Sequence, residues 1–273
     1  MSYKIGIFDS GVGGLTVFNS IFQKLPNYHY IYLGDNARAP YGNHSYDTVL
    51  QFTWESVRWL LNQDCQLVIV ACNTASAKAL RTIQQKFLPS FNPFKRVLGV
   101  IRPTAEKIGN FSFTKHVGLL ATTGTINSES YDIEINKFFP DIKLFKQACP
   151  LLVPLIENQA VYSEGGDFFI NQYVNLLLNQ HDKIDTILLG CTHYPLISDL
   201  ITKQINKKIT LVDQGYIVAD SLVEYLQRHP EINNLLSKYK KIEYFTTDDI
   251  IKFKALAKIF TNQEIEVQKI NLV

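Results

Sequence analysis

The chain has 273 residues, of which 46% are hydrophobic and 19% are charged, and its net charge is +2 at pH 7. This composition supplies enough apolar side chains for one large or two modest domains. The low net charge and the lack of a basic block give no electrostatic sign of binding to nucleic acid or to an anionic membrane. No signal peptide or transmembrane segment is recognisable, so we expect a cytoplasmic protein with reduced thiols and no membrane or nucleic-acid partner.

A glycine-rich turn follows the first predicted strand. Residues 4–8 form this strand, Asp9 and Ser10 come next, and three glycines lie among the four residues before a predicted helix over 15–25. Glycines permit a sharp turn and a close approach of the backbone to a ligand, at the N-terminus of that helix. The spacing differs from the dinucleotide-binding fingerprint. A small anion such as a carboxylate suits this turn, and so does a plain strand-to-helix connection.

An irregular loop, residues 34–44, follows the second predicted strand, residues 28–33. It contains Pro40, Tyr41 and Gly42. Loops that pass the ends of strands commonly carry functional groups. This loop could offer a backbone N–H and a hydroxyl to a substrate, or it could be only a turn.

The next predicted strand ends in a cysteine. Residues 67–71 are apolar, and Cys72, Asn73 and Thr74 follow at the start of a predicted helix. Ligands bind at the carboxyl ends of strands in open α/β sheets, and a helix N-terminus favours a thiolate. A single cysteine in this position is, however, more often a small buried hydrophobe than a catalyst.

The second part of the chain repeats the unit of strand, polar turn and helix. A predicted strand over residues 116–121 precedes a threonine-rich turn over 122–125, which has the composition of a helix-capping anion site. A later apolar segment ends at Glu157. On spacing alone a surface position is the usual explanation for this acid, and a position in a site is the less common one.

A second apolar strand, residues 186–190, also ends in a cysteine. Cys191 is followed by Thr192 and His193, much as Cys72 is followed by two polar residues. The pair favours a functional interpretation, because both thiols lie at strand ends that precede helices. No Cys-x-x-Cys motif occurs and no second ligand pair has metal-site spacing, so we expect no metal.

The alternation of strands and helices with short connections predicts an α/β fold with parallel sheets. The likeness of the two cysteine segments predicts two α/β halves, with the last segment of the chain returning to the first half. We therefore expect one domain from residues 1–97 and 210–273, and a second domain from residues 98–209.

Two opposed thiols suit the inversion of a carbon acid such as the α-carbon of an amino acid. Inversion removes a proton from one face and returns a proton to the other, so two bases on opposite walls avoid turning the substrate. A modest pKa shift sets a thiol in either protonation state near neutral pH. Hydroxyls and N–H groups of Ser10, Thr74 and Thr192 could hold the substrate carboxylate. This specification requires no cofactor.

Five segments, in order along most of the chain, resemble the bacterial glutamate racemases of the cofactor-independent amino-acid racemase superfamily. They are Gly-Ile-Phe-Asp-Ser-Gly-Val-Gly-Gly-Leu at 6–15, Pro-Tyr-Gly at 40–42, Ala-Cys-Asn-Thr-Ala at 71–75, Pro-Leu-Ile-Glu at 154–157 and Leu-Gly-Cys-Thr-His-Tyr-Pro-Leu at 189–196. Together they are highly specific. His193 resembles the glutamate enzymes more than the aspartate racemases, which tend to carry an acid there.

The resemblance implies two pseudo-symmetric α/β domains with the active site in the cleft between them, and neither pyridoxal phosphate nor a metal. It implies that Cys72 and Cys191 are the acid/base residues. Asp9 would assist Cys72, and Glu157 and His193 would assist Cys191. The family makes D-glutamate for peptidoglycan synthesis, usually as a homodimer. The implied glutamate-binding residues are Asp9, Ser10, Pro40, Tyr41, Gly42, Asn73, Thr74, Thr192 and His193.

Two segments depart from the family pattern. Residues 102–104 are Arg-Pro-Thr where many members have an acidic or apolar residue followed by Pro-Gly, and residues 213–215 are Asp-Gln-Gly in place of the more usual Asp-Ser-Gly. Both lie outside the substrate motifs. We therefore expect them to affect loop shape, dimer contacts or regulation, and to leave the reaction itself unchanged.

Three other functions remain open. An aspartate or hydantoin racemase, or a decarboxylase of the same superfamily, would share the motifs, although the decarboxylase would need only one cysteine. A nucleophilic Cys191 with His193 would form a covalent intermediate, but two residues along one turn make poor triad geometry. A two-lobed binding module would hold glutamate without exchanging its α-proton.

Overall fold

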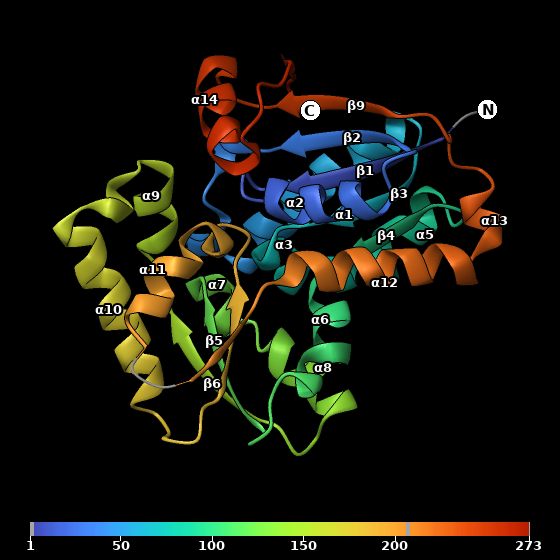
Figure 1. Ribbon diagram of the computed structural model, residues 1–273. Coiled ribbons are helices and arrows are strands. Elements are labelled where there is room, and N and C mark those ends of the chain that lie inside the picture. The colour runs from blue at the N-terminus through green and yellow to red at the C-terminus, as the bar shows by residue number, and fades with distance from the viewer. Residues whose placement is uncertain (1–2, 206–207, 273) are drawn as a thin grey trace.

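The computed structural model describes residues 3–205 and 208–272, which form two β-sheets (Figure 1). Every strand pair within these residues is parallel. The predicted α/β fold class is therefore confirmed. The six-stranded sheet has the order β10-β9-β2-β1-β3-β4 and the four-stranded sheet the order β6-β5-β7-β8. The strands are β1 (Lys4–Asp9), β2 (His29–Gly34), β3 (Cys65–Val70), β4 (Arg96–Gly99), β5 (His116–Ala121), β6 (Lys143–Ala148), β7 (Thr186–Gly190), β8 (Thr210–Val212), β9 (Lys241–Thr246) and β10 (Val267–Lys269).

Helices surround both sheets. The α-helices are α1 (Leu15–Lys24), α2 (Tyr46–Asn62), α3 (Asn73–Lys78), α4 (Leu80–Thr82), α5 (Leu88–Phe91), α6 (Ile101–Lys107), α7 (Thr123–Asn127), α8 (Ser130–Phe138), α9 (Leu152–Glu157), α10 (Glu164–Leu178), α11 (Ser198–Lys203), α12 (Gln214–Arg228), α13 (Pro230–Asn233) and α14 (Ile250–Thr261). A π-turn joins α4 to α5, and short 3-10 turns include Asn36–Arg38 and Tyr41–Asn43 in the loop after β2. None of the helices within the described ranges combines the length and the apolar character needed to span a membrane.

The inner strands β1, β3, β5 and β7 are largely apolar because parallel strands within a sheet are covered on both faces. Ile5 and Ile7 of β1 pack in one core cluster with α1, α12 and α14, whereas Phe8 packs in a second cluster with α2 and α3. All residues of β3 and β7 are buried. The strands that precede the two cysteines are thus held in the centres of their sheets.

The two sheets share a core topology. The order β2-β1-β3-β4 in the larger sheet matches the order β6-β5-β7-β8 in the smaller one, so β3 and β7 occupy equivalent places. Cys72 and Cys191 follow these equivalent strands. The likeness that the sequence shows between the two cysteine segments therefore has a topological basis.

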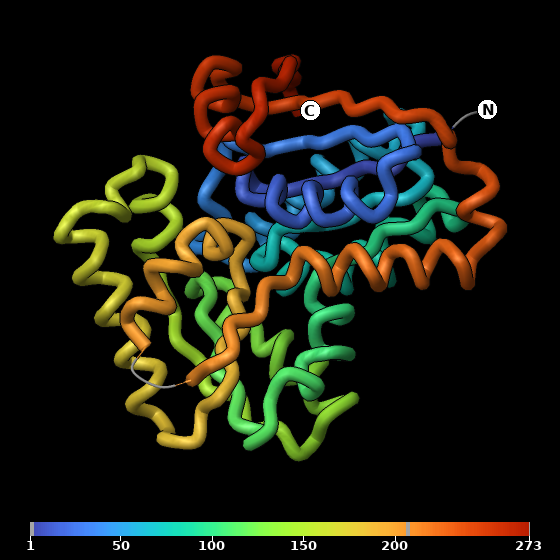
Figure 2. Tube along the Cα trace, viewed as in Figure 1, coloured from blue at the N-terminus to red at the C-terminus, as the bar shows by residue number. Residues whose placement is uncertain are grey.

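Helix α12 carries the chain back from the smaller sheet to the larger one. In Figures 1 and 2 it is the orange helix that runs between the two sheets. It packs against α1 and α6. Residues 210–212, which the sequence analysis assigned to the first domain, form β8 of the smaller sheet, because β8 pairs with β7. The division of the chain into two domains otherwise stays a prediction.

The Arg-Pro-Thr segment at 102–104 lies in the first turn of α6, where a proline is tolerated.

Candidate active site

A cavity of about 30 Å³ lies where the carboxyl ends of the two sheets meet. Eleven of the twelve residues that the sequence analysis proposed for the site line it, and the twelfth, Asp9, is buried next to this lining. Because β1, β3 and β7 are all parallel central strands, the segments that follow them meet at this edge. The lining residues are Ser10, Gly11, Ala39, Pro40, Tyr41, Gly42, Cys72, Asn73, Thr74, Thr122, Val153, Glu157, Cys191, Thr192 and His193.

Cys72 lies at the N-terminus of α3 and close to a hydroxyl. Its Sγ accepts a hydrogen bond from the N–H of Ala75 at 3.5 Å and lies 3.3 Å from Oγ of Ser10. Burial, reinforced by the negative charge of Asp9, raises the pKa of the Cys72 thiol to about 12, and the two hydrogen bonds only partly oppose this. The sequence analysis expected a thiolate here. Burial outweighs the effect of the short helix, so Cys72 is a neutral thiol in this structure.

Asp9 is completely buried beside Cys72. The N–H of Gly11 donates to its Oδ2 at 2.9 Å. Burial raises the pKa of Asp9, although the charge of His193 and the N–H groups of Gly11 and Gly14 oppose the rise. A buried carboxyl with a raised pKa next to a thiol is a group that can hold or accept a proton.

His193 joins Cys191 to Glu157. Its Nδ1 lies 3.9 Å from Sγ of Cys191, and its Nε2 donates to Oε1 of Glu157 at 2.9 Å. Burial disfavours the charged ring, but the interactions with Cys191 and Glu157 together outweigh it and raise the pKa of His193 to about 10. The ring is therefore an imidazolium at neutral pH, with one N–H toward the sulfur and the other toward the carboxylate.

The glycine-rich turn packs directly on the Cys191 turn. A Cβ atom at Gly13 would lie 2.4 Å from Nδ1 of His193 and 2.5 Å from Oγ1 of Thr192. One turn further along, Oγ1 of Thr16 donates to the carbonyl of Thr192 at 2.9 Å. Glycine is needed at position 13 for this close approach, and the turn thereby holds the two cysteine segments together.

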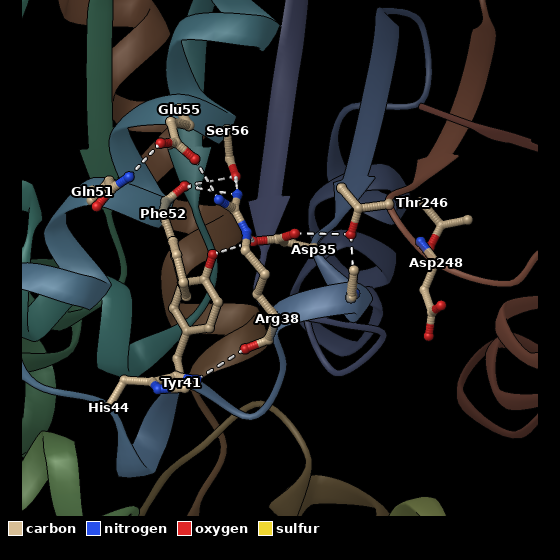
Figure 3. Close-up of polar contacts among 12 residues, drawn as sticks. Asp35, Arg38, Tyr41, His44, Gln51, Phe52, Glu55, Ser56, Thr246 and Asp248 are labelled. Carbon is tan, nitrogen blue, oxygen red and sulfur yellow. Dashed lines mark hydrogen bonds and ion pairs between the residues drawn. The ribbon is translucent and has the colours of Figure 1, made fainter. Parts of the chain in front are cut away.

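Tyr41 is anchored by a buried charged network (Figure 3). Its hydroxyl donates to Oδ2 of Asp35, and Nε of Arg38 donates to the same oxygen at 2.6 Å. Arg38 also pairs with Glu55 and lies 4.2 Å above the ring of Phe52. The sequence analysis left open whether this loop offers a hydroxyl to a substrate or is only a turn. In this structure the Tyr41 hydroxyl is bonded to Asp35, and Tyr41 lines the cavity.

Thr122 lines the cavity and was not among the residues predicted for the site. Oγ1 of Thr122 lies 2.8 Å from Oγ1 of Thr74. A Cβ added at Gly42 would lie 2.9 Å from Cβ of Thr122. Thr122 follows β5 and caps α7 by accepting from the N–H of Thr125. The polar turn after β5 was visible in the sequence. Only the pairing of β5 with β7 shows that it borders the cavity.

The remaining cysteines lie outside the cavity. Cys65 begins β3, at the far end of the strand from Cys72, and Cys149 follows β6. All four cysteines are free and buried. Among the described residues, no group of three or more His, Cys, Asp or Glu side chains is arranged to hold a metal ion.

Comparisons with known proteins show the family of this chain. Residues 5–222 match the family described as Asp/Glu/Hydantoin racemase. The glutamate racemase of Streptococcus agalactiae serotype III is 35% identical over 273 residues, which cover 99% of each chain. Two solved structures are also similar, and each is 32% identical and covers 99% of this chain and 98% of the other. Glutamate racemase isoform RacE1 from Bacillus anthracis has a TM-score of 0.89. The Francisella tularensis glutamate racemase in complex with D-glutamate has a TM-score of 0.87. This chain therefore belongs to the Asp/Glu/hydantoin racemase family.

Proposed function

We propose that this enzyme interconverts L- and D-glutamate, with Cys72 and Cys191 exchanging protons with the α-carbon from opposite sides. The observation that carries the proposal is that both thiols line one cavity and that each has its own polar partner, Ser10 for Cys72 and His193 for Cys191. The choice of glutamate is supported by full-length relatives that are glutamate racemases, one of them solved with D-glutamate.

The two thiols start the reaction in different protonation states. In one direction, Cys191 acts as a thiolate paired with the His193 imidazolium and removes the α-proton. The electron pair of the broken C–H bond stays on the substrate as a carbanion, delocalised into the carboxylate. The Cys72 thiol then gives its proton to the opposite face, which leaves Cys72 as the thiolate and Cys191 as the thiol. The other enantiomer reacts from that second state, and the roles reverse.

Auxiliary acids would reset the two thiols. Asp9, buried beside Cys72, is placed to take or return the proton of that thiol. On the other side, His193 and Glu157 form the pair that balances charge when Cys191 changes state. The burial of Asp9 and the hydrogen bond between His193 and Glu157 support these roles, and the raised pKa values of Asp9 and His193 agree with them.

Substrate binding requires polar groups and additional space. Hydroxyls and N–H groups from Ser10, Asn73, Thr74 and Thr192 would hold the carboxylates, and the residues around Pro40 would close the cavity. A cavity of about 30 Å³ holds roughly two water molecules. Glutamate is larger than two water molecules, so we expect the cavity to widen when glutamate binds.

The biological setting follows from the family. We propose that the product, D-glutamate, supplies peptidoglycan synthesis, and that the enzyme works as a cytoplasmic homodimer. A reducing compartment is supported by the requirement for two free thiols. Light scattering of the purified protein tests the dimer. Depletion of the protein in a growing cell, with rescue by added D-glutamate, tests the pathway.

A deuterium-exchange assay tests the reaction. Purified protein is incubated with L-glutamate in deuterated water without added cofactor, and optical rotation and α-deuterium are followed together. Loss of rotation with deuterium uptake supports the proposal. Exchange only from aspartate or another amino acid would keep the chemistry and change the substrate, and no exchange from any amino acid would overturn the assignment.

A further inference from the structure

A closed ring of hydrogen bonds lies behind Asn73. Nδ2 of Asn73 donates to Oε1 of Gln214 at 2.7 Å, Nε2 of Gln214 donates to the hydroxyl of Tyr131, and that hydroxyl donates to Oδ1 of Asn73 at 2.6 Å. All three side chains are buried. Such a ring leaves none of its three members free to rotate without breaking two bonds.

The hydrogen bonds of the ring can be donated in one direction around it only. The single hydroxyl hydrogen of Tyr131 goes to Asn73, so Tyr131 must accept from Gln214. The second Nε2 hydrogen of Gln214 is fixed in the same way, because Oγ1 of Thr104 donates to the carbonyl of Val100 and accepts from Gln214 at 2.9 Å. A flipped Gln214 amide would place its NH2 group against that of Asn73. The orientations of both amides are therefore set.

The ring joins segments that follow both sheets. Asn73 is the first residue of α3, after β3 of the larger sheet, and Tyr131 lies in the first turn of α8, after β5 of the smaller sheet. Gln214 begins α12, the helix that returns the chain between the sheets (Figure 1). Asn73, at the edge of the cavity, is thus held by residues from both halves of the molecule.

The ring also connects the two segments in which this chain departs from the family pattern. Gln214 belongs to the Asp-Gln-Gly segment and Thr104 to the Arg-Pro-Thr segment, and the two side chains are hydrogen-bonded to each other. A serine at position 214 would have one hydroxyl with one hydrogen and could not bond to Asn73, Tyr131 and Thr104 together. The two departures are therefore one structural unit.

We infer that Gln214 is a positioning residue that orients the amide of Asn73 for the substrate. Asn73 lines the cavity, its Oδ1 is bonded to Tyr131, and one Nδ2 hydrogen is bonded to Gln214. The second Nδ2 hydrogen is then the group that Asn73 can offer to a substrate oxygen. This inference rests on the proposed function, in which Asn73 helps to hold glutamate.

The expected effect lies in KM. A hydrogen bond to a carboxylate that does not react is made equally in the ground state and the transition state, so its loss raises KM and leaves kcat nearly unchanged. Gln214→Leu removes the amide and keeps most of the volume. We expect its KM for glutamate to rise roughly 10-fold, the effect of one lost charged hydrogen bond, with kcat within about 3-fold of the wild type.

The matched control is Gln66→Leu. Gln66 is also a buried glutamine, in β3, and its Nε2 donates to the carbonyl of Phe94 at 2.6 Å, away from the cavity. This variant loses a buried hydrogen bond without touching the ring, and we expect an unchanged KM. An equal rise of KM in both variants would overturn the inference, because it would show a general effect of destabilisation.

A double-mutant cycle isolates the path through Asn73. In an Asn73→Ala background, Gln214→Leu should change KM no further, whereas a full additional 10-fold rise would contradict the inference. If Gln214→Leu does not fold, Thr104→Val serves instead. It removes one acceptor of Gln214 and keeps the side-chain shape, so KM should rise in the same direction by a smaller factor, and an unchanged KM would count against the inference.

A second readout separates this inference from the proposed function. In protein labelled with 15N-asparagine, the side-chain N–H groups of Asn73 should exchange with solvent at least roughly 10-fold faster in Gln214→Leu than in the wild type, because the ring is open. If the wild type fails to racemise glutamate, the proposed function fails. The exchange measurement still decides the role of Gln214, and equal exchange in the two proteins would overturn it.

Discussion

Oε1 of Glu157 accepts a hydrogen bond from Nε2 of His193 at 2.9 Å, and this pair lies on the Cys191 side of the cavity. The Cys72 side has no such pair and has the hydroxyl of Ser10 and the buried Asp9 instead. The two thiols follow equivalent strands but have chemically different partners. The enzyme therefore has a pseudo-symmetric fold and an asymmetric site.

The asymmetry predicts the behaviour of His193→Ala. The equilibrium constant of a racemisation is 1, so kcat/KM must fall equally in both directions. The loss of kcat, roughly 10²-fold or more, should be larger in one direction, because His193 supports only Cys191. Initial rates from L- and D-glutamate measure this. His229→Ala, at a half-exposed histidine far along the chain, is the control. An equal fall of kcat in both directions would indicate a purely binding role.

Replacing either thiol should stop the reaction. Cys72→Ala and Cys191→Ala each remove one acid/base group, and racemisation should fall by roughly 10²–10⁴-fold or more with the fold intact. Cys65→Ala is the matched control, because Cys65 begins β3 and Cys72 lies beyond the opposite end of that strand. We expect the Cys65→Ala control to keep the kcat of the wild type. Full activity in either of the first two variants would contradict the two-base mechanism.

Alkaline pH should weaken the stabilising effect of His193. Its pKa is raised from 6.5 to about 10 in the folded protein. The stabilisation is therefore complete below pH 6.5, declines above it and is lost as the pH rises through about 10. Urea unfolding at several pH values should show that the difference in unfolding free energy between wild type and His193→Gln shrinks over this range. A constant difference would contradict the assigned charge of the ring.

A methyl group at Gly13 should displace two residues of the site by direct contact. The added Cβ would meet the ring of His193 and the hydroxyl of Thr192, so Gly13→Ala should displace both and lower kcat/KM by roughly 10-fold or more. Gly165→Ala is the matched control, because only Ser163 lies near its added Cβ, at 3.8 Å. The control should keep its activity and gain up to about 1 kcal/mol of stability. Normal activity in Gly13→Ala would show that the turn can move away from His193 and Thr192 without disturbing the site.

Removing Arg38 should destabilise the fold. Arg38→Gln leaves the carboxylate of Asp35, which is completely buried, without its ion pair, at a cost of about 3 kcal/mol. Arg102→Gln breaks an exposed pair with Glu106 and should change stability by about 0.5 kcal/mol or less. Urea denaturation of both variants measures the difference. Similar losses would mean that burial of Asp35 does not set the strength of the network.

The sequence was sufficient for the fold class and for most of the residues that line the cavity. The two cysteine segments carry a strong signal, because central parallel strands are continuous apolar runs and the polar residues that follow them stand out. Thr122 and Asp35 were missed for another reason. Their roles depend on contacts between segments distant in sequence, such as Thr122 with Thr74, and no local pattern encodes these contacts.

The protonation states could not be read from the sequence either. The position of Cys72 before a helix suggested a thiolate, but α3 has only six residues and the thiol is buried. Desolvation then decides the pKa, and it depends on how the whole molecule packs over the sulfur. The hydroxyl of Tyr41 is a similar case, because Asp35 lies next to it only in the folded chain.

The larger sheet is completed by strands that lie far apart in the chain. β9 pairs with β2 along its whole length, and β10 pairs with β9, although more than 200 residues separate β2 from β9 in the chain. The strands of the four-stranded sheet, in contrast, all lie between residues 116 and 212. A chain cut before β9 would leave the edge of β2 unpaired, and an unpaired apolar edge is the kind of surface that promotes aggregation.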